Sequence, residues 1–188
     1  MGNTAPKEVG SFAVKDQWIV WVLLLGFGIK LAIFPLHTWL PTTYVVAHPN
    51  TTALIASVVA KLGVFGIIRI VVPLVPIALS TYAQMLFGGL GAIAIVYGAL
   101  VALAQTDLRR VLAYSSLSHV GFITLGLMSM NTEGLTGAVV HMFNHGIITC
   151  GMFLILAMIE QRQGRVSLIE QDRGIAAIYP RIGVMMLF

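Results

Sequence analysis

The chain has 188 residues, of which 58% are hydrophobic and only 10% are charged. Soluble domains are usually about 25% charged, and charge this sparse cannot cover the surface of a soluble domain, so we predict an integral membrane protein. The net charge of +4 is scattered, without a basic run or a basic patch carrying aromatic residues, which argues against nucleic acid as a partner.

The first 17 residues, "MGNTAPKEVGSFAVKDQ", form a polar segment that is too acidic and too poor in apolar residues for a signal peptide. We place the transmembrane domain at residues 18–188. The single cysteine, Cys150, lies in an apolar run and has no partner for an internal disulfide.

A membrane-spanning helix needs about 20 mostly apolar residues. The sequence predicts five such helices, at 18–40, 52–72, 82–104, 108–128 and 135–159, and a sixth that begins near Pro180. Because the chain ends inside this last helix, we expect it to be part of a longer membrane protein. The expected fold class is therefore an all-α, polytopic helical bundle.

Positive charge predicts how the bundle is oriented. The 105–110 turn and the 160–181 loop fall on one side and hold six arginines, whereas the opposite side holds Lys7, Lys15 and Arg69. We therefore expect the N-terminus outside and the 160–181 loop in the cytoplasm, matrix or stroma. In the 82–104 helix, Gly88, Gly91 and Gly98 are expected to allow close helix packing.

The first predicted helix contains the stretch "GFGIKLAIFPLHTWLP", in which Lys30 is followed by Pro35 and Pro41. Proline removes a backbone donor, and non-helical backbone at membrane depth must be packed in protein or line a water-filled cavity. The sequence thus predicts a helix broken at Pro35 and Pro41, beside a charged side chain. A simple kink that improves packing is the alternative.

Two lysines, Lys30 and Lys61, are predicted near the membrane midplane, at about 1.5 Å of rise per residue. A lysine at the centre of a spanning helix costs about 2.5–3.5 kcal/mol. One interpretation is that each side chain reaches an interface. The other is that both lysines face a hydrated interior and exchange protons.

Three histidines also fall inside predicted helices. His119 lies in the 108–128 helix, and His141 and His145 lie four residues apart, hence on one face of the 135–159 helix. Histidine titrates near neutral pH and can relay a proton through either ring nitrogen. The alternative is a structural hydrogen bond to a backbone carbonyl. We predict no metal site, because His141 and His145 lack a third ligand nearby.

All the acidic residues of the sequence are predicted at helix ends or in loops. No carboxylate is left at mid-membrane to neutralise Lys30 or Lys61. Either the lysines are held neutral, or the partner carboxylate lies outside this chain.

Four stretches carry a resemblance to a known family: "FGIKLAIFPLHTWLP", "AKLGVFGIIR", "ALAQTDLRRVLAYSSLSHVGFITLGL" and "GAVVHMFNHGIITCGMFLI". In order and spacing they resemble the antiporter-like proton-pumping subunits of respiratory complex I, above all the M-type, which is subunit 4 in mitochondria and has a counterpart in the photosynthetic complex. The resemblance runs from about Trp18 to Phe188. It implies two inverted helical repeats, with this chain covering the second half of the first repeat and the start of the second.

The resemblance also implies roles for individual residues. Lys30 matches the broken-helix lysine that pairs with a glutamate on an earlier helix, and Lys61 matches the central connecting lysine. His119 and His145 match histidines of a hydrated polar axis, and we add His141 as a candidate. In such a subunit these groups translocate protons.

The resemblance further implies the setting of the chain. Its partners are other membrane subunits of a complex I-like assembly, the lipid bilayer and protons. This chain holds no cofactor. NADH or ferredoxin, FMN, iron–sulfur clusters and quinone are expected elsewhere in the complex, in a bacterial inner, mitochondrial inner or thylakoid membrane.

Three alternatives stay open. Thr42 and Tyr44 stand where the family usually has Asp and His, in a loop that also varies among subunits of multisubunit sodium/proton antiporters. Such an antiporter subunit would use the same residues in an exchange cycle. A membrane-bound hydrogenase subunit shares the motifs. A non-conducting scaffold would use the lysines only to hold helices together.

Overall fold

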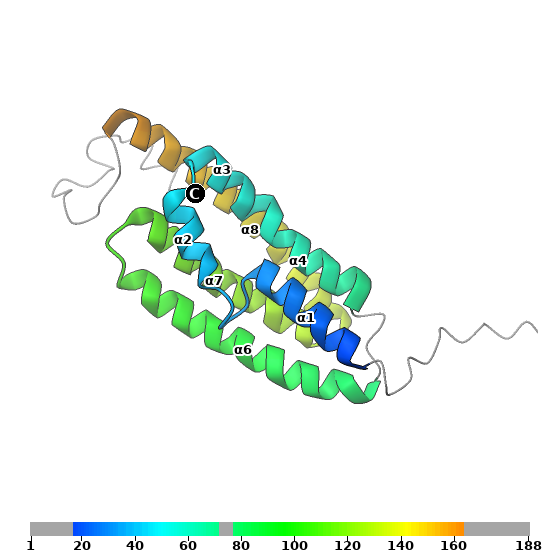
Figure 1. Cartoon of the computed structure of the whole chain (residues 1–188). Helices are drawn as coiled ribbons and strands as arrows, with labels where there is room; N and C mark the ends of the chain where they lie inside the picture. The colour runs from blue at the N-terminus through cyan, green and yellow to red at the C-terminus, as the bar shows by residue number, and fades with distance from the viewer. Residues whose placement is uncertain (1–16, 72–76, 164–188) are drawn as a thin grey trace, which may run out of the picture.

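The computed structural model describes residues 17–71 and 77–163, which form a bundle of helices that run along one another (Figure 1). Four helical segments in this part of the chain are long and apolar enough to cross a membrane, and Trp18–Leu31 is a shorter apolar helix. The prediction of an all-α, polytopic membrane bundle is thus confirmed. The first 16 residues of the polar segment predicted at 1–17, and the helix predicted near Pro180, lie outside the described residues, and Gln17 begins α1.

The first predicted span is two helices, α1 (Gln17–Leu31) and α2 (Trp39–Val46), separated by residues 32–38. Ala32 ends α1 with a left-handed backbone (φ 62°), a conformation that commonly follows the last turn of a helix. The indole of Trp39 donates a hydrogen bond of 2.9 Å across the break to the Ile29 carbonyl. That carbonyl also accepts the Ala32 amide at 3.0 Å, so side-chain and backbone donors satisfy the interrupted helix end.

Pro35 and Pro41 lie in different kinds of backbone structure. Pro35 lies within the break, as predicted, after a cis peptide bond with Phe34. The prediction that Pro41 also breaks the helix is wrong, because Pro41 is buried in the first turn of α2. Proline is tolerated there because the amides of a first helical turn have no intrahelical partner.

The second span is continuous from Pro49 to Val71. It consists of α3 (Pro49–Leu54), the π-helix η2 (Ile55–Val59), α4 (Ala60–Gly66) and the π-helix η3 (Ile67–Val71). Hydropathy predicted a span over 52–72 but not these π-helical turns. Such turns are rare and often lie at functional sites, and Lys61 lies just beyond the first of them.

Three long helices follow: α6 (Ile77–Leu103), α7 (Leu108–Met128) and α8 (Thr132–Gln163). The helix predicted over 108–128 coincides with α7, whereas α6 and α8 begin earlier than predicted.

α6 lies alongside α7 (Figure 1). A Cβ at Gly98 would lie 2.6 Å from the Ser118 amide, and one at Gly91 would lie 3.0 Å from the Gly121 carbonyl. The packing role predicted for these two glycines is confirmed, whereas a Cβ at Gly88 would lie at an ordinary contact distance of 3.6 Å from Met128 Cβ.

Buried side chains form two apolar clusters. One includes Leu24, Val64 and Ile123 and joins α1, α4 and α7. The other includes Tyr44 and Phe153, whose rings meet edge to face at 5.1 Å, and joins α2 to α8. Each half of the broken span is thus held by its own cluster.

α7 begins with a side-chain cap. The Asp107 carboxylate accepts a 2.8 Å hydrogen bond from the Arg109 amide, which satisfies one of the free amides of the first turn. We expect Asp107→Ala to destabilise the protein by about 1 kcal/mol, with little change for Asp107→Asn, which keeps an acceptor. Thermal unfolding of the detergent-solubilised full-length subunit measures both, and an unchanged Asp107→Ala midpoint would contradict a stabilising cap.

Candidate functional site

Lys61 and His145 form a direct pair inside the bundle. The Lys61 ammonium lies 2.8 Å from Nδ1 of His145. Lys61 belongs to α4 and His145 to α8, and the two residues are 84 positions apart in the sequence. Lys61 Nζ also donates to the Ala56 carbonyl in η2. His145 is only 5% exposed. The lysine is therefore held between a backbone acceptor and a titratable ring, and its partner is a histidine of this chain, which was not predicted from the sequence.

The hydrogen-bond directions around His145 are mutually consistent. An ammonium can only donate, so Nδ1 accepts from Lys61 and the ring proton resides on Nε2. Nε2 lies 3.3 Å from Thr149 Oγ1, and the Thr149 hydroxyl donates to the His145 carbonyl at 2.5 Å. Both ring nitrogens are satisfied when Lys61 is charged and His145 is neutral.

The other two histidines lie beside this pair. Nδ1 of His119 lies 3.2 Å from Nε2 of His141, within hydrogen-bond distance. The ring centroids of His119 and His145 are 5.1 Å apart, and those of His141 and His145 are 6.4 Å apart. The structure thus brings together four of the predicted site residues from α4, α7 and α8, and it confirms that His141 and His145 share a face of α8.

Two pockets are lined by both His119 and His141. One, of about 420 Å³, is lined by all three histidines together with Ser115, Ser116, Asn144 and Thr149 among others. A second, of about 590 Å³, is lined by His119 and His141 and extends to Ser129, Asn131 and Glu133 at the α7–α8 turn. Both offer several polar partners and enough room for water molecules.

Lys30 lies apart from this cluster. It is in the last turn of α1 and its side chain is exposed. Among the described residues, no hydrogen bond or ion pair reaches the Lys30 side chain. The prediction that Lys30 adjoins the helix break is confirmed, whereas its predicted proton-exchanging role stays a prediction.

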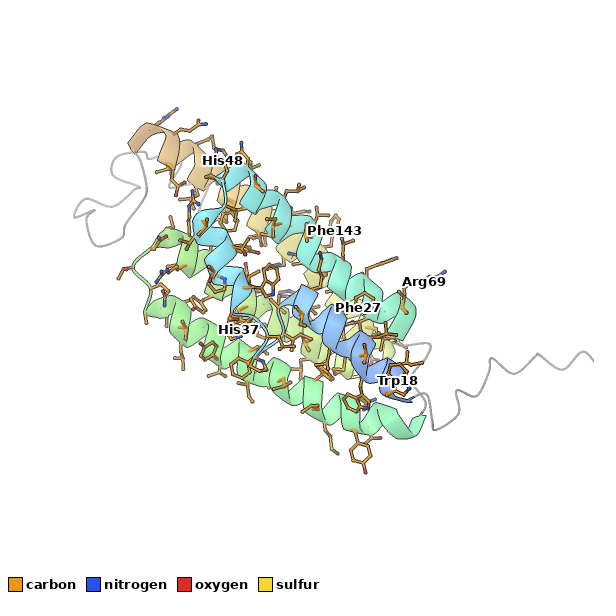
Figure 2. All side chains as sticks on the ribbon, in the orientation of Figure 1. Trp18, Phe27, His37, His48, Arg69 and Phe143 are labelled. Carbon is orange, nitrogen blue, oxygen red and sulfur yellow. The ribbon has the colours of Figure 1, made fainter. Side chains whose placement is uncertain are left out.

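His37 lies in the break itself, where the chain passes from α1 to α2 (Figure 2). Its ring stacks on Phe34 and meets Tyr97 of α6 edge to face, with centroids 5.4 Å apart in each case. The side chain is 5% exposed and its Nδ1 has no hydrogen-bond partner within the described part of the chain. The break is therefore packed against α6, as non-helical backbone at membrane depth must be.

A second polar contact, missed in the sequence, joins Arg109 and Glu160. These residues form a buried ion pair between the start of α7 and α8, with each side chain 10% exposed. From the sequence, Arg109 counted only as one of the six arginines that orient the bundle, Glu160 was placed at a helix end or in a loop, and neither was given a partner. Their separation of 51 residues leaves no sequence signal for the pair. In the described ranges, no group of three or more His, Cys, Asp or Glu residues is arranged to hold a metal ion.

The described residues form a bundle of membrane-length helices and one broken, shorter span, with a lysine and three histidines clustered inside. This arrangement defines a polytopic membrane protein that carries titratable groups in its interior. The chain belongs to the family described as "NADH:quinone oxidoreductase/Mrp antiporter, TM", whose model matches residues 7–188. The match confirms the resemblance drawn from the sequence motifs.

Individual relatives agree with this family. The chain is 44% identical over 168 residues to NAD(P)H-quinone oxidoreductase chain 4, chloroplastic, of Physcomitrium patens, a match covering 87% of this chain and 33% of the relative. Respiratory complex I from Thermus thermophilus contains a similar chain, with a TM-score of 0.81 and 36% identity, covering 89% of this chain and 35% of that one.

A chain of the Mrp complex from Dietzia sp. is also similar, with a TM-score of 0.83 and 26% identity. That match covers 91% of this chain and 32% of the other. The chain thus spans about a third of the length of the relatives that it matches.

Proposed function

We propose that this chain is part of a proton-translocating membrane subunit of an NADH- or ferredoxin-linked quinone oxidoreductase. The observation that carries the proposal is the hydrogen bond between Lys61 and His145 inside the bundle. A desolvated lysine beside a neutral imidazole is a pair that can share one proton between two sites. The family and the identity to a quinone oxidoreductase chain support this interpretation.

The central step is a proton transfer within the pair. Charged Lys61 passes its proton to His145 Nδ1, which leaves a neutral amine and an imidazolium. While the proton is on Nε2, it is donated to Thr149 Oγ1, and this contact holds the ring in place. The imidazolium can then release its Nε2 proton to water in the cavity that His145 and Thr149 line, because this nitrogen is distinct from the one that received a proton.

His119 and His141 extend the relay from His145. No direct hydrogen bond joins His145 to either ring within the described residues, so the transfer crosses water in the cavity that all three line. The second cavity continues from the histidine pair toward Glu133. Lys30 joins the relay at the helix break, with a partner carboxylate outside this chain.

The energy for this transfer comes from elsewhere in the complex. Moving one charge across 100 mV costs about 2.3 kcal/mol, comparable to a modest pKa shift at a single site. Electron transfer from NADH or ferredoxin through FMN and iron–sulfur clusters to quinone, in other subunits, would change the charge states of these lysines. We place the protein in a bacterial inner, mitochondrial inner or thylakoid membrane, with the N-terminus outside and the 160–181 loop cytoplasmic.

A sodium/proton antiporter subunit is the second candidate. The similarity to a chain of the Mrp complex favours it, and the family model covers both kinds of protein. Such a subunit would use the same lysine and histidines in an exchange cycle. It would require sodium and no redox partner.

The test is proton uptake by membrane vesicles energised with NADH, comparing the wild-type full-length subunit with Lys30→Met. We expect pumping to be lost while the complex stays assembled, because Lys30 supplies an exchangeable proton at the break. Arg69→Met serves as the control, since Arg69 is exposed in η3, at the end of the second span opposite His48 (Figure 2). Pumping that persists in Lys30→Met would remove that residue from the relay, and a requirement for sodium would favour the antiporter.

A further inference from the structure

The Arg109–Glu160 pair lies away from the lysine–histidine cluster, and the relay described above does not use it. Arg109 Nε donates to Glu160 Oε1 at 2.8 Å, and its Nη2 pairs with Glu160 Oε2. The contact is a two-pronged fork between a planar guanidinium and a carboxylate. This geometry is specific to arginine, because a lysine ammonium cannot present two parallel donors.

The remaining donor atom of Arg109 reaches a third helix. Nη1 lies 3.3 Å from the Tyr44 carbonyl, 3.1 Å from that of Val45 and 2.7 Å from that of Ala47. These oxygens belong to the last turn of α2 and its C-cap, where helical carbonyls have no partner in the helix. A cation is stabilised at such a helix end. Arg109 therefore uses both sides of its guanidinium, one for Glu160 and one for the end of α2.

Arg109 lies at the corner where the chain turns from α2 into α3. α2 ends at Val46, and α3 begins at Pro49, so residues 47–48 turn the chain from the broken span into the helix that carries Lys61. Lys61 lies 12 residues after Pro49 in the same span, about 18 Å along a helix that rises 1.5 Å per residue. Glu160 belongs to α8, the helix of His145. The Arg109 side chain thus connects the C-terminal end of α2, just before the span that carries Lys61, to α8, the helix of His145.

We propose that Arg109 and Glu160 are positioning residues for proton translocation. Their ion pair, together with the carbonyls at the end of α2, forms a latch that fixes the α2–α3 corner against α7 and α8. Through these helices the latch sets the contact between Lys61 Nζ and His145 Nδ1. This inference rests on the proposed function.

The test uses the full-length subunit in its assembled complex, in vesicles energised with NADH. The variants are Arg109→Met and Glu160→Gln, the second of which keeps the shape of the side chain and removes only its charge. Arg110→Met is the matched control, because Arg110 is the neighbouring residue and is exposed. Lys61→Met is the reference for a broken relay. Protons taken up per NADH oxidised and amide hydrogen exchange over residues 43–54 are measured for each.

We expect Arg109→Met and Glu160→Gln to pump as few protons per NADH as Lys61→Met, with NADH oxidation retained. A misplacement of about 1 Å in a reacting pair can cost about a hundredfold in rate. Arg109→Lys should recover only part of the loss. Exchange over 43–54 should be faster in both latch variants and unchanged in Arg110→Met. If the corner exchanges faster while pumping stays normal, the latch is structural only and the positioning role is overturned.

Exchanging the charges gives a sharper test. In the double variant Arg109→Glu, Glu160→Arg the pair keeps opposite charges, but the carboxylate at position 109 would face carbonyl oxygens. We expect no recovery of pumping. Full recovery would overturn the latch, since the pair would then act only through its mutual charge.

The two proposals can fail separately. Normal pumping by Lys61→Met would refute the proposed function, whatever Arg109→Met does. Unchanged exchange over 43–54 in Arg109→Met would refute the latch, whatever Lys61→Met does.

Discussion

Replacing Lys61 with methionine is expected to abolish proton uptake that depends on this subunit while the complex still assembles. Methionine has similar length but no proton to exchange. It leaves Nδ1 of His145 without its 2.8 Å donor and the Ala56 carbonyl without the ammonium that it accepts. Proton uptake by NADH-energised vesicles, normalised to NADH oxidation, measures the effect.

The variant Lys61→Arg distinguishes a role of Lys61 in a proton relay from a purely structural role in a non-conducting scaffold. Arginine keeps the positive charge and can donate to the same acceptors, but it does not release a proton at neutral pH. A proton relay therefore loses pumping in Lys61→Arg as it does in Lys61→Met. If Lys61→Arg pumps normally, Lys61 only holds helices together through its charge and the relay is refuted.

The second large effect is expected for Gly121→Val, which should prevent α6 and α7 from packing. A Cβ at Gly121 would lie 2.6 Å from the Gly91 carbonyl and 2.8 Å from the Ile95 amide. Both neighbours are backbone atoms, so the helices themselves must separate. Overpacking typically costs about 1–3 kcal/mol, and we expect the upper end of this range because a movement of the Ile95 side chain, which also lies 2.8 Å away, would leave both backbone clashes in place. A lower thermal midpoint and less assembled subunit should result.

Gly89→Val is the matched control for this prediction. Gly89 lies on α6 and a Cβ there meets nothing within 4 Å among the described residues. The same β-branched side chain is thus added to a helix of the same pair without a clash between α6 and α7. Equal loss of assembled subunit in Gly89→Val and Gly121→Val would show that close approach of α6 and α7 is not the cause.

Local features of the fold followed from the sequence. The 21 apolar-rich residues of α7 were predicted with their bounds, because hydropathy averaged over a span is a local property. The break at Pro35 was predicted because proline lacks a backbone donor. Pro41 was assigned wrongly, because the sequence does not say where a new helix starts. The position of proline relative to that start decides whether it interrupts a helix or opens one.

The candidate site was predicted as a set of residues but not as an arrangement. Lys61, His119, His141 and His145 stood out because charged or titratable groups are costly inside a membrane. Because the sequence offers no carboxylate at mid-membrane, the lysines were expected either to be held neutral or to pair with a carboxylate outside this chain. The partner of Lys61 is a histidine 84 residues away, and nothing in the spacing within either helix predicts which turn of α8 faces which turn of α4.

The sequence by itself determined that this is a polytopic membrane protein with a broken helix and titratable groups at membrane depth. Composition, hydropathy and proline chemistry act within single segments, and each can be read along the chain. Only the tertiary structure decided that His145 faces Lys61 and that Arg109 binds both Glu160 and the end of α2. Those contacts depend on the rotation and offset of one helix against another, which close packing of small and apolar residues sets across the whole bundle.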